Sequence, residues 1–195
     1  MIKDLALKNR SYRGYDESYT FSREDLLEYV DIARVCASSM NKQVLKFYVA
    51  NEKEDVDKIF ALTRWAGMLP NEKLPREGKK PTAFIVICLD HEVVPNANLA
   101  TFGYDVGIAA QTMLLAATEK GLGGIMMIGL KLDVLGQTLE LRESLQPVLV
   151  VAFGKPDDDV RIVDMPESGS TKYWRDENDV HYVPKRSLEE LVINK

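Results

Sequence analysis

Three long segments of the chain space their apolar residues as an α-helix does. Residues 22–36 open with Ser22 and acids in the first turn, and this capping pattern marks the start of a helix. Residues 53–66 repeat the helical spacing. Residues 104–120 are apolar nearly all round, which places that helix in the middle of the protein or in a subunit interface. Shorter helices are predicted ahead of Arg10, over 131–140 and from Ser187.

Four other segments have the pattern of β-strands. Residues 44–50 alternate apolar and polar side chains, as a half-buried strand does. Residues 84–89 and 147–153 are continuous apolar runs of strand length, which predicts strands that are covered on both faces. Residues 123–128 are expected to form a fourth strand. The alternation of helices and strands favours an α+β or α/β sandwich, with helices packed on a central sheet.

Two segments lack either pattern. Residues 67–81 contain several glycines and prolines and predict a long loop. Residues 157–184 are polar, and we expect them to be irregular. At 195 residues the chain has the length of one domain, spanning 1–195.

The net charge and the longest apolar runs limit the classes of protein to which this chain could belong. Lys and Arg number 25 against 30 Asp and Glu, a formal net charge of −5, which argues against a general nucleic-acid binder. The N-terminus has no apolar stretch of signal-peptide length, and no run approaches the roughly 18 apolar residues of a membrane span. We therefore expect a cytoplasmic protein that binds neither nucleic acid nor a membrane.

The sequence carries no catalytic signature made of side chains. Cys36 and Cys88 lie far apart in apolar stretches, and two histidines cannot supply a three-histidine zinc site, so we expect no metal. The glycine patterns of a phosphate-binding loop, a dinucleotide fold and a nucleophile elbow are all missing. If the protein is an enzyme, its chemistry belongs to a bound cofactor.

Three polar segments are candidates for binding such a cofactor. Arg10, Ser11 and Arg13 suit a dianionic phosphate, although they could equally be surface residues. Residues 184–187 repeat this chemistry just before a helix, where the alternative is a solvated basic pair. Residues 38–43 could bond to the edge of a polar ring or a sugar, or could form an ordinary capping turn.

In order along the chain, these segments resemble the motifs of the nitroreductase family of flavin enzymes. Residues 10–15 resemble the opening R-R-S-x-R-x-[FY], and residues 37–43 resemble P-S-S-x-N-x-Q. Residues 105–123 resemble D-x-G-x-A-x-Q, L-L-A-A and G-L-G in succession. Residues 153–156 and 184–190 complete the match.

The chain departs from the family pattern in three places. Asn9 stands where many members have the first of two arginines. Ala37 and Val44 replace prolines. The turn over residues 126–129 reads Met-Met-Ile-Gly where relatives often have Cys, Trp or Glu, which leaves the substrate preference open.

The resemblance implies a fold and an assembly. The fold is a three-layer α+β sandwich whose central sheet is mostly antiparallel and flanked by helices. The implied assembly is a homodimer, with one FMN in each of two interface pockets and the helix over 104–120 at the dimer core.

The resemblance also implies a set of cofactor contacts. One subunit would supply Arg10, Ser11 and Arg13, with Lys185 and Arg186 on the same phosphate. The partner subunit would supply Ser38, Ser39, Met40 and Asn41. The group near the isoalloxazine ring would be Met126, Ile128 and Gly129.

The implied activity needs no catalytic side chain. NADH or NADPH would deliver a hydride to N5 of the flavin and leave, and a small acceptor such as a nitroaromatic or quinone would then take the electrons in a ping-pong reaction. Arg13 is the candidate for the cation near flavin N1, and Arg10 for the phosphate, although the two could be exchanged. Trp65 and the loop over 67–81 would line the substrate channel, unless Trp65 simply packs in the core.

Three alternatives remain open. A flavin protein of the same superfamily could perform another redox reaction, such as reductive dehalogenation or flavin destruction. The chain could bind a flavin without turnover, as a store or sensor. It could also be an interaction module without a cofactor.

Overall fold

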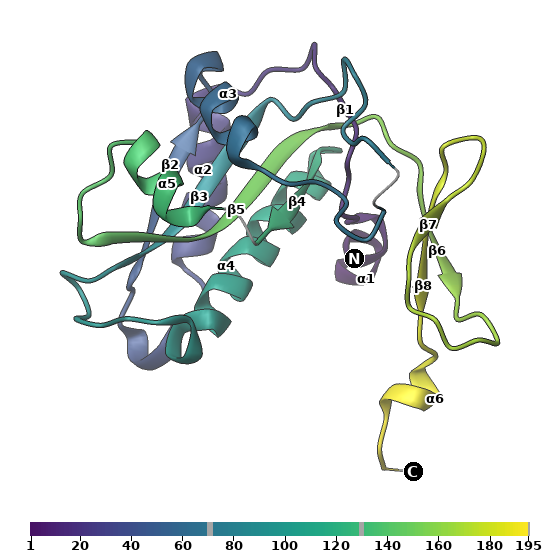
Figure 1. The fold of residues 1–195 in the computed structure, drawn as a ribbon. Coiled ribbons are helices and arrows are strands. Elements are labelled where there is room, and N and C mark those ends of the chain that lie inside the picture. The colour runs from purple at the N-terminus through teal and green to yellow at the C-terminus, as the bar shows by residue number, and fades with distance from the viewer. Residues whose placement is uncertain (70–71, 129–130, 195) are drawn as a thin grey trace.

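The centre of the molecule is a five-stranded sheet (Figure 1), seen in a computed structural model that describes residues 1–69, 72–128 and 131–194. The strands are β1 (Tyr15–Asp16), β2 (Leu45–Ala50), β3 (Ala83–Asp90), β4 (Gly123–Met127) and β5 (Leu145–Pro156). They run in the order β2–β3–β5, and both β4 and β1 also pair with β5. All of these pairings are antiparallel.

Helices cover both faces of this sheet. The helices of the molecule are α1 (Ile2–Lys8), α2 (Arg23–Arg34), α3 (Lys53–Leu62), α4 (Leu99–Glu119), α5 (Leu132–Thr138) and α6 (Leu188–Leu191). Helices α2 and α4 pack on one face, and α3 and α5 pack on the other. The predicted three-layer α+β sandwich is therefore confirmed.

Strand β3 shows why both faces are covered. Ile85, Ile87 and Leu89 point toward α2 and α4, whereas Phe84 and Val86 point toward α3 and α5. All eight residues of the strand are buried. An apolar side chain at every position can be buried only when both faces of the sheet are covered.

The predicted elements are present, with shifted ends. Helix α4 begins at Leu99 instead of residue 104, because the side chain of Asn98 caps it by accepting a hydrogen bond from the Thr101 N–H at 3.1 Å. Helix α3 ends at Leu62 instead of residue 66. No helix in the described part of the chain is long and apolar enough to cross a membrane.

The expectation that residues 157–184 are irregular is wrong. They contain β6 (Val160–Asp164) and β7 (Trp174–Arg175) and lead into β8 (His181–Lys185); the three strands form a second sheet in the order β6–β8–β7. Strands β6 and β8 are parallel. The second sheet stands beside the sandwich, and α6 projects from its end (Figure 1). Its strands are short and only partly buried, so they lack the apolar pattern that marks a core strand.

Candidate cofactor-binding site

Two tyrosines fix residues 10–13 against the sandwich. Ser11 forms a parallel bridge with Gly124 of β4, and the Tyr12 N–H donates to the Gly124 carbonyl at 3.3 Å. The Tyr12 ring lies on Gly123, where a Cβ would approach the ring to 2.6 Å. The Tyr15 hydroxyl donates to the carbonyl of Tyr12 at 2.8 Å. The G-L-G stretch is therefore needed for close packing with the arginine segment.

A cavity of about 370 Å³ opens where residues 10–13 meet the second sheet. Five of the residues predicted to bind the cofactor line it together: Arg10, Ser11, Arg13, Met126 and Lys185. The remaining lining residues are Ala6, Asn9, Gln111, Leu114, Val160, Tyr173, His181 and Val183. The structure thus brings together the two basic segments, which are more than 170 residues apart in the sequence.

Strand β8 supplies one wall of the cavity by simple alternation. His181, Val183 and Lys185 all line it, as expected for every second residue of a strand. Sequence reasoning selected only Lys185. Residues 181–185 show no regular alternation of apolar and polar side chains, so no strand was predicted there.

The cationic side chains in the cavity have unused donors. Arg10 donates from Nη2 to the Ala6 carbonyl at 2.6 Å, and Arg13 donates from Nη1 to the Ser11 carbonyl at 3.0 Å. The Nε atoms of both are buried without a hydrogen-bond partner. Among the described residues no carboxylate pairs with Arg10, Arg13 or Lys185. Such a cluster suits an anionic group with several acceptor oxygens, and the phosphate of FMN is a group of this kind.

Burial also affects the charge of these groups. It lowers the pKa of Arg13, although nearby Asp158 and Tyr173 act in the opposite direction. Burial likewise lowers the pKa of Arg10. Removing a cation from water without a carboxylate partner is unfavourable, so an anion in the cavity would be bound favourably.

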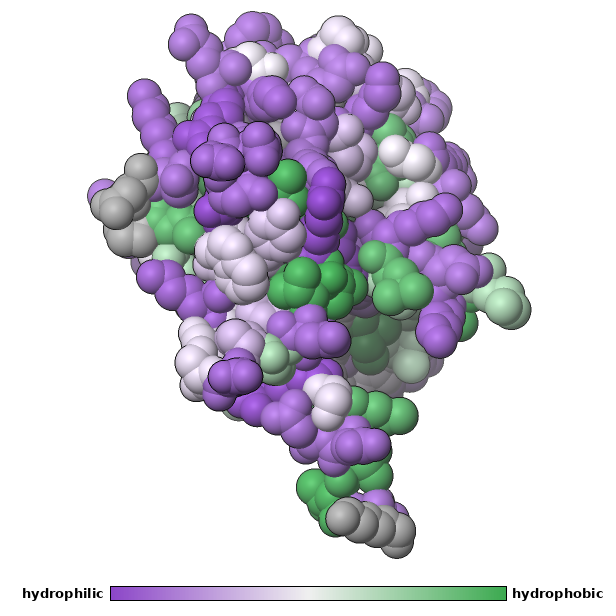
Figure 2. All heavy atoms as spheres, turned by 90° about the vertical axis from the view of Figure 1, so that its right-hand side faces the viewer, coloured by the Kyte–Doolittle hydropathy of each residue, from purple (hydrophilic) through white to green (hydrophobic). Residues whose placement is uncertain are grey.

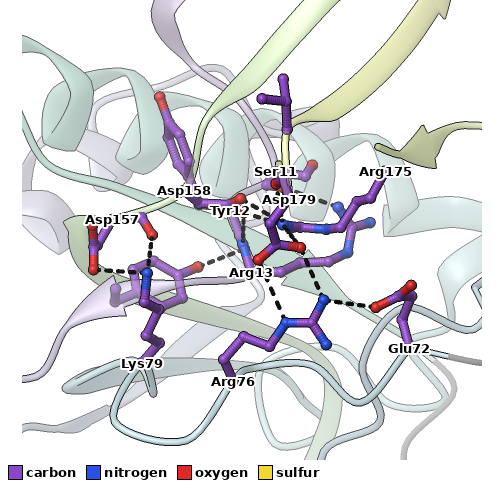
Figure 3. A network of polar contacts seen from close by, with 12 residues as sticks. Ser11, Tyr12, Arg13, Glu72, Arg76, Lys79, Asp157, Asp158, Arg175 and Asp179 are labelled. Atoms are coloured by element: carbon purple, nitrogen blue, oxygen red, sulfur yellow. Dashed lines mark hydrogen bonds and ion pairs between the residues drawn. The ribbon is translucent and has the colours of Figure 1, made fainter. Parts of the chain in front are cut away.

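A network of ion pairs attaches the second sheet to this site (Figure 3). Asp158 accepts the backbone N–H of Arg13 at 2.8 Å and pairs with Arg175 at 2.9 Å, and the side chains of Asp158 and Arg175 are only 2% and 5% exposed. Asp179 pairs with Arg76 at 2.9 Å, and Arg76 also pairs with Glu72 at 2.7 Å. The network therefore connects the loop after α3, the arginine segment and the second sheet. Sequence reasoning missed these pairs, since Asp158–Arg175 and Asp179–Arg76 join separate segments and Glu72–Arg76 lies in a predicted loop.

His181 occupies an unusual position in the cavity. It is fully buried, and neither ring nitrogen has a hydrogen-bond partner. Its ring lies 5.0 Å from the ring of Tyr173, and the guanidinium of Arg13 lies 4.8 Å from the same tyrosine ring. Burial, together with the charges of Arg13 and Arg175, lowers the pKa of His181 to about 4. The imidazole is therefore neutral at pH 7.

The predicted polar segment over residues 38–41 lies elsewhere. Ser39 donates from its N–H and its hydroxyl to Asp105, at 3.0 and 2.6 Å, and Asp105 is buried in α4. Met40 and Asn41 have the left-handed φ angles 51° and 52°, which are uncommon for residues other than glycine. Ser38 lines a separate cavity of about 210 Å³. Asp105 of the D-x-G-x-A-x-Q motif thus holds this turn in shape.

The other predicted site residues have varied surroundings. Ile128 follows β4 and is 77% exposed. Gly129 lies outside the described residues. Arg186 is half exposed and pairs with Glu190 at 3.2 Å. Trp65 packs against Phe60, with ring centroids 6.0 Å apart, in the apolar layer that contains α3.

Comparison with known proteins places this chain in a family. The sequence model of the nitroreductase family matches residues 6–155. An oxygen-insensitive NADPH nitroreductase of Helicobacter acinonychis is 29% identical over 114 residues, which are 57% of this chain and 50% of that protein. The chain thus spans about half the length of this curated relative.

Solved structures share the fold over the whole chain. A Desulfovibrio desulfuricans protein described as a nitroreductase in complex with FMN superposes with a TM-score of 0.71, at 22% identity, over 100% of this chain and 96% of its own. A nitroreductase family protein from Streptococcus pneumoniae gives 0.70 at 15% identity, over 100% of both chains. The matched motifs, the sandwich and the family model agree, and this chain belongs to the nitroreductase family.

Proposed function

We propose that this protein is an FMN-dependent oxidoreductase that takes a hydride from NADH or NADPH and reduces a small acceptor, such as a nitroaromatic or a quinone. One observation carries the proposal: Arg10, Arg13 and Lys185 meet in a single cavity, and no carboxylate of the described chain pairs with them. The family membership and the FMN complex of the Desulfovibrio relative support it.

The residues divide between the two ends of the cofactor. Arg10, Ser11 and Lys185 would hold the phosphate through charge-assisted hydrogen bonds. Arg186 would join them by exchanging its exposed Glu190 partner for the phosphate. Arg13 would lie beside the ring, where a cation stabilises the negative charge that reduction places near N1.

Bound FMN would supply the redox chemistry, accepting two electrons and a proton from the nicotinamide in one half-reaction and giving electrons to the acceptor in the other. The chain positions the ring and sets its electrostatic surroundings. Met126 lines the cavity from β4, and Ile128, which follows β4, would lie toward the isoalloxazine.

The proposed active form is a homodimer. Helix α4 leaves Tyr104 79% exposed and Ile108 40% exposed, although most of this helix is apolar. Apolar side chains also gather on the C-terminal segment, where Leu188 and Leu191 are exposed (Figure 2). Exposed apolar surface of this kind is typical of an interface. In the dimer, Ser38, Ser39, Met40 and Asn41 would reach the cofactor of the partner subunit.

Flavin binding tests the cofactor. Titration of the purified protein with FMN, followed by quenching of flavin fluorescence, should show saturable binding. Arg10→Ala and Lys185→Ala should each weaken it at least about tenfold, because each removes charge-assisted bonds. Lys53→Ala removes an exposed cation from α3 on the opposite layer and should leave binding unchanged. Absence of FMN binding by the wild-type protein would overturn the proposal.

Turnover tests the activity. With FMN bound, the protein should oxidise NADH or NADPH in the presence of menadione, and initial-rate plots at several acceptor concentrations should give the parallel lines of a ping-pong reaction. Tight FMN binding without any oxidation of nicotinamide would instead identify a flavin-binding protein without turnover.

A further inference from the structure

We propose that His181 is a further cofactor-contacting residue, whose imidazole hydrogen-bonds the polar edge of the isoalloxazine ring beside Arg13. This inference rests on the proposed FMN site and adds a residue that the family motifs did not select. It assigns to the second sheet a contact with the ring as well as one with the phosphate.

His181 lies on the same strand as Lys185. His181 and Lys185 line the same cavity from the same strand, four residues apart. At about 3.3 Å per residue their backbones are roughly 13 Å apart. If Lys185 meets the phosphate, His181 therefore lies at the far end of the cavity, with the length of the ribityl chain between them.

His181 and Arg13 share their surroundings in the cavity. Both lie against the ring of Tyr173, at 5.0 and 4.8 Å. Arg13 is the residue proposed for the ring, so His181 belongs to the same end. Met126 of β4 lines the cavity as well and supplies an apolar surface there.

The imidazole of His181 has unused hydrogen-bonding capacity. Both ring nitrogens of His181 are buried without a partner. A neutral imidazole offers one donor and one acceptor, and the pyrimidine edge of the isoalloxazine alternates carbonyl oxygens with ring nitrogens. Leaving such a group unpaired inside a protein is unfavourable, so a ligand that pairs with it gains affinity. Burial, and then the neighbouring cations Arg13 and Arg175, lower the pKa of His181 and keep the imidazole uncharged, which preserves its acceptor nitrogen.

Variants at position 181 test this proposal with two probes, FMN and riboflavin, which lacks the phosphate. His181→Leu should weaken the binding of both flavins about tenfold, the loss of roughly one good hydrogen bond. His181→Gln keeps a donor and an acceptor and should lose less than His181→Leu. Lys185→Ala is the matched comparison and should weaken FMN while leaving riboflavin nearly unchanged.

The melting temperature of the protein without flavin separates contact from scaffolding. His181→Leu removes two unpaired polar atoms, so the melting temperature should stay the same or rise. If the leucine variant does not fold, His181→Met carries the same comparison.

Three results would overturn the proposal: unchanged affinity for both flavins, a loss confined to FMN, or a lower melting temperature in the flavin-free protein. The first shows no contact, the second assigns His181 to the phosphate, and the third shows a structural role. Failure of the proposed function is a different result, because the wild-type protein would then bind neither flavin.

Discussion

The central sandwich and the second sheet border the same cavity, but different forces hold them. Strand β3 is buried along its whole length between two apolar layers. The second sheet buries few apolar side chains, and Asp158 with Arg175 and Asp179 with Arg76 attach it to the rest of the molecule. Apolar burial is non-directional, whereas buried ion pairs demand a particular geometry.

This difference matters because the cavity lies between the two regions. Arg10, Ser11 and Met126 belong to the sandwich side, while His181 and Lys185 come from β8. Cofactor affinity should therefore depend on how firmly the second sheet is attached. The sandwich can therefore remain folded while the site is lost.

The largest effect is expected in the sandwich. Phe153 is fully buried and stacks on Tyr29 with ring centroids 5.3 Å apart. Phe153→Ala should lower the free energy of unfolding by about 3–5 kcal/mol, because it removes apolar contacts and leaves a cavity. Trp174→Ala in the second sheet should cost less than about 1 kcal/mol, since that ring is 40% exposed. If urea denaturation gives the same loss of unfolding free energy for both variants, the two regions do not differ in this way.

Acid should act on the second sheet through His181. Its pKa is lowered to about 4 in the folded protein, chiefly by burial and then by Arg13 and Arg175, with Asp179 opposing them. Below about pH 6.5 the unfolded chain therefore binds a proton that the folded chain does not. The free energy of unfolding should be greatest above pH 6.5 and fall by roughly 3 kcal/mol toward pH 4.

His181→Leu is the control for this pH dependence. Urea denaturation at successive pH values should show a flatter profile for the variant between pH 6.5 and 4. An identical profile in both proteins would show that His181 titrates normally in the folded state.

The ion-pair network should show an intermediate and local effect. Asp158→Asn leaves the buried guanidinium of Arg175 with Asp179 as its remaining carboxylate, at 3.1 Å. We expect a cost of about 2–3 kcal/mol. The variant should show faster amide hydrogen exchange than the wild type over residues 174–185, with the exchange of β3 and β5 unchanged. Asp157→Asn, which breaks an exposed pair with Lys79, should cost less than about 1 kcal/mol.

A smaller effect than that of Asp158→Asn is expected where Ser39 bonds to Asp105 within the sandwich. Asp105→Asn places an amide N–H₂ where the carboxylate accepts hydrogen bonds from Ser39. The melting curve should report a loss of about 1–2 kcal/mol. Ser39→Ala keeps the backbone N–H bond to Asp105 and should cost less. A larger loss for Ser39→Ala would mean that the hydroxyl, and not the carboxylate, organises the turn.

The two regions also differed in how well the sequence predicted them. The continuous apolar runs over 84–89 and 147–153 identified β3 and β5, because burial on both faces requires apolar residues at every position. The second sheet was missed because its strands are short and only partly buried. The early start of α4 was missed too, because Asn98 was not recognised as the residue that caps this helix.

The candidate site was predicted in part, for a similar reason. Arg10, Ser11, Arg13, Met126 and Lys185 were selected from motifs, and they do line one cavity. Other lining residues were not selected, among them Gln111, Tyr173 and His181. Nothing local distinguishes a buried histidine from an exposed one in a polar segment. The pairing of β8 with β6 is what turns His181 inward.

The amino-acid order alone determined the layered sandwich and the types of group available for an anion, because helical and strand periodicity and side-chain charge are local properties. Only the tertiary structure decided which cations share a cavity, whether a carboxylate of the described residues pairs with them, and which histidine is neutral. Those outcomes depend on distances between residues far apart in the chain and on the exclusion of water, and neither is written in any short segment.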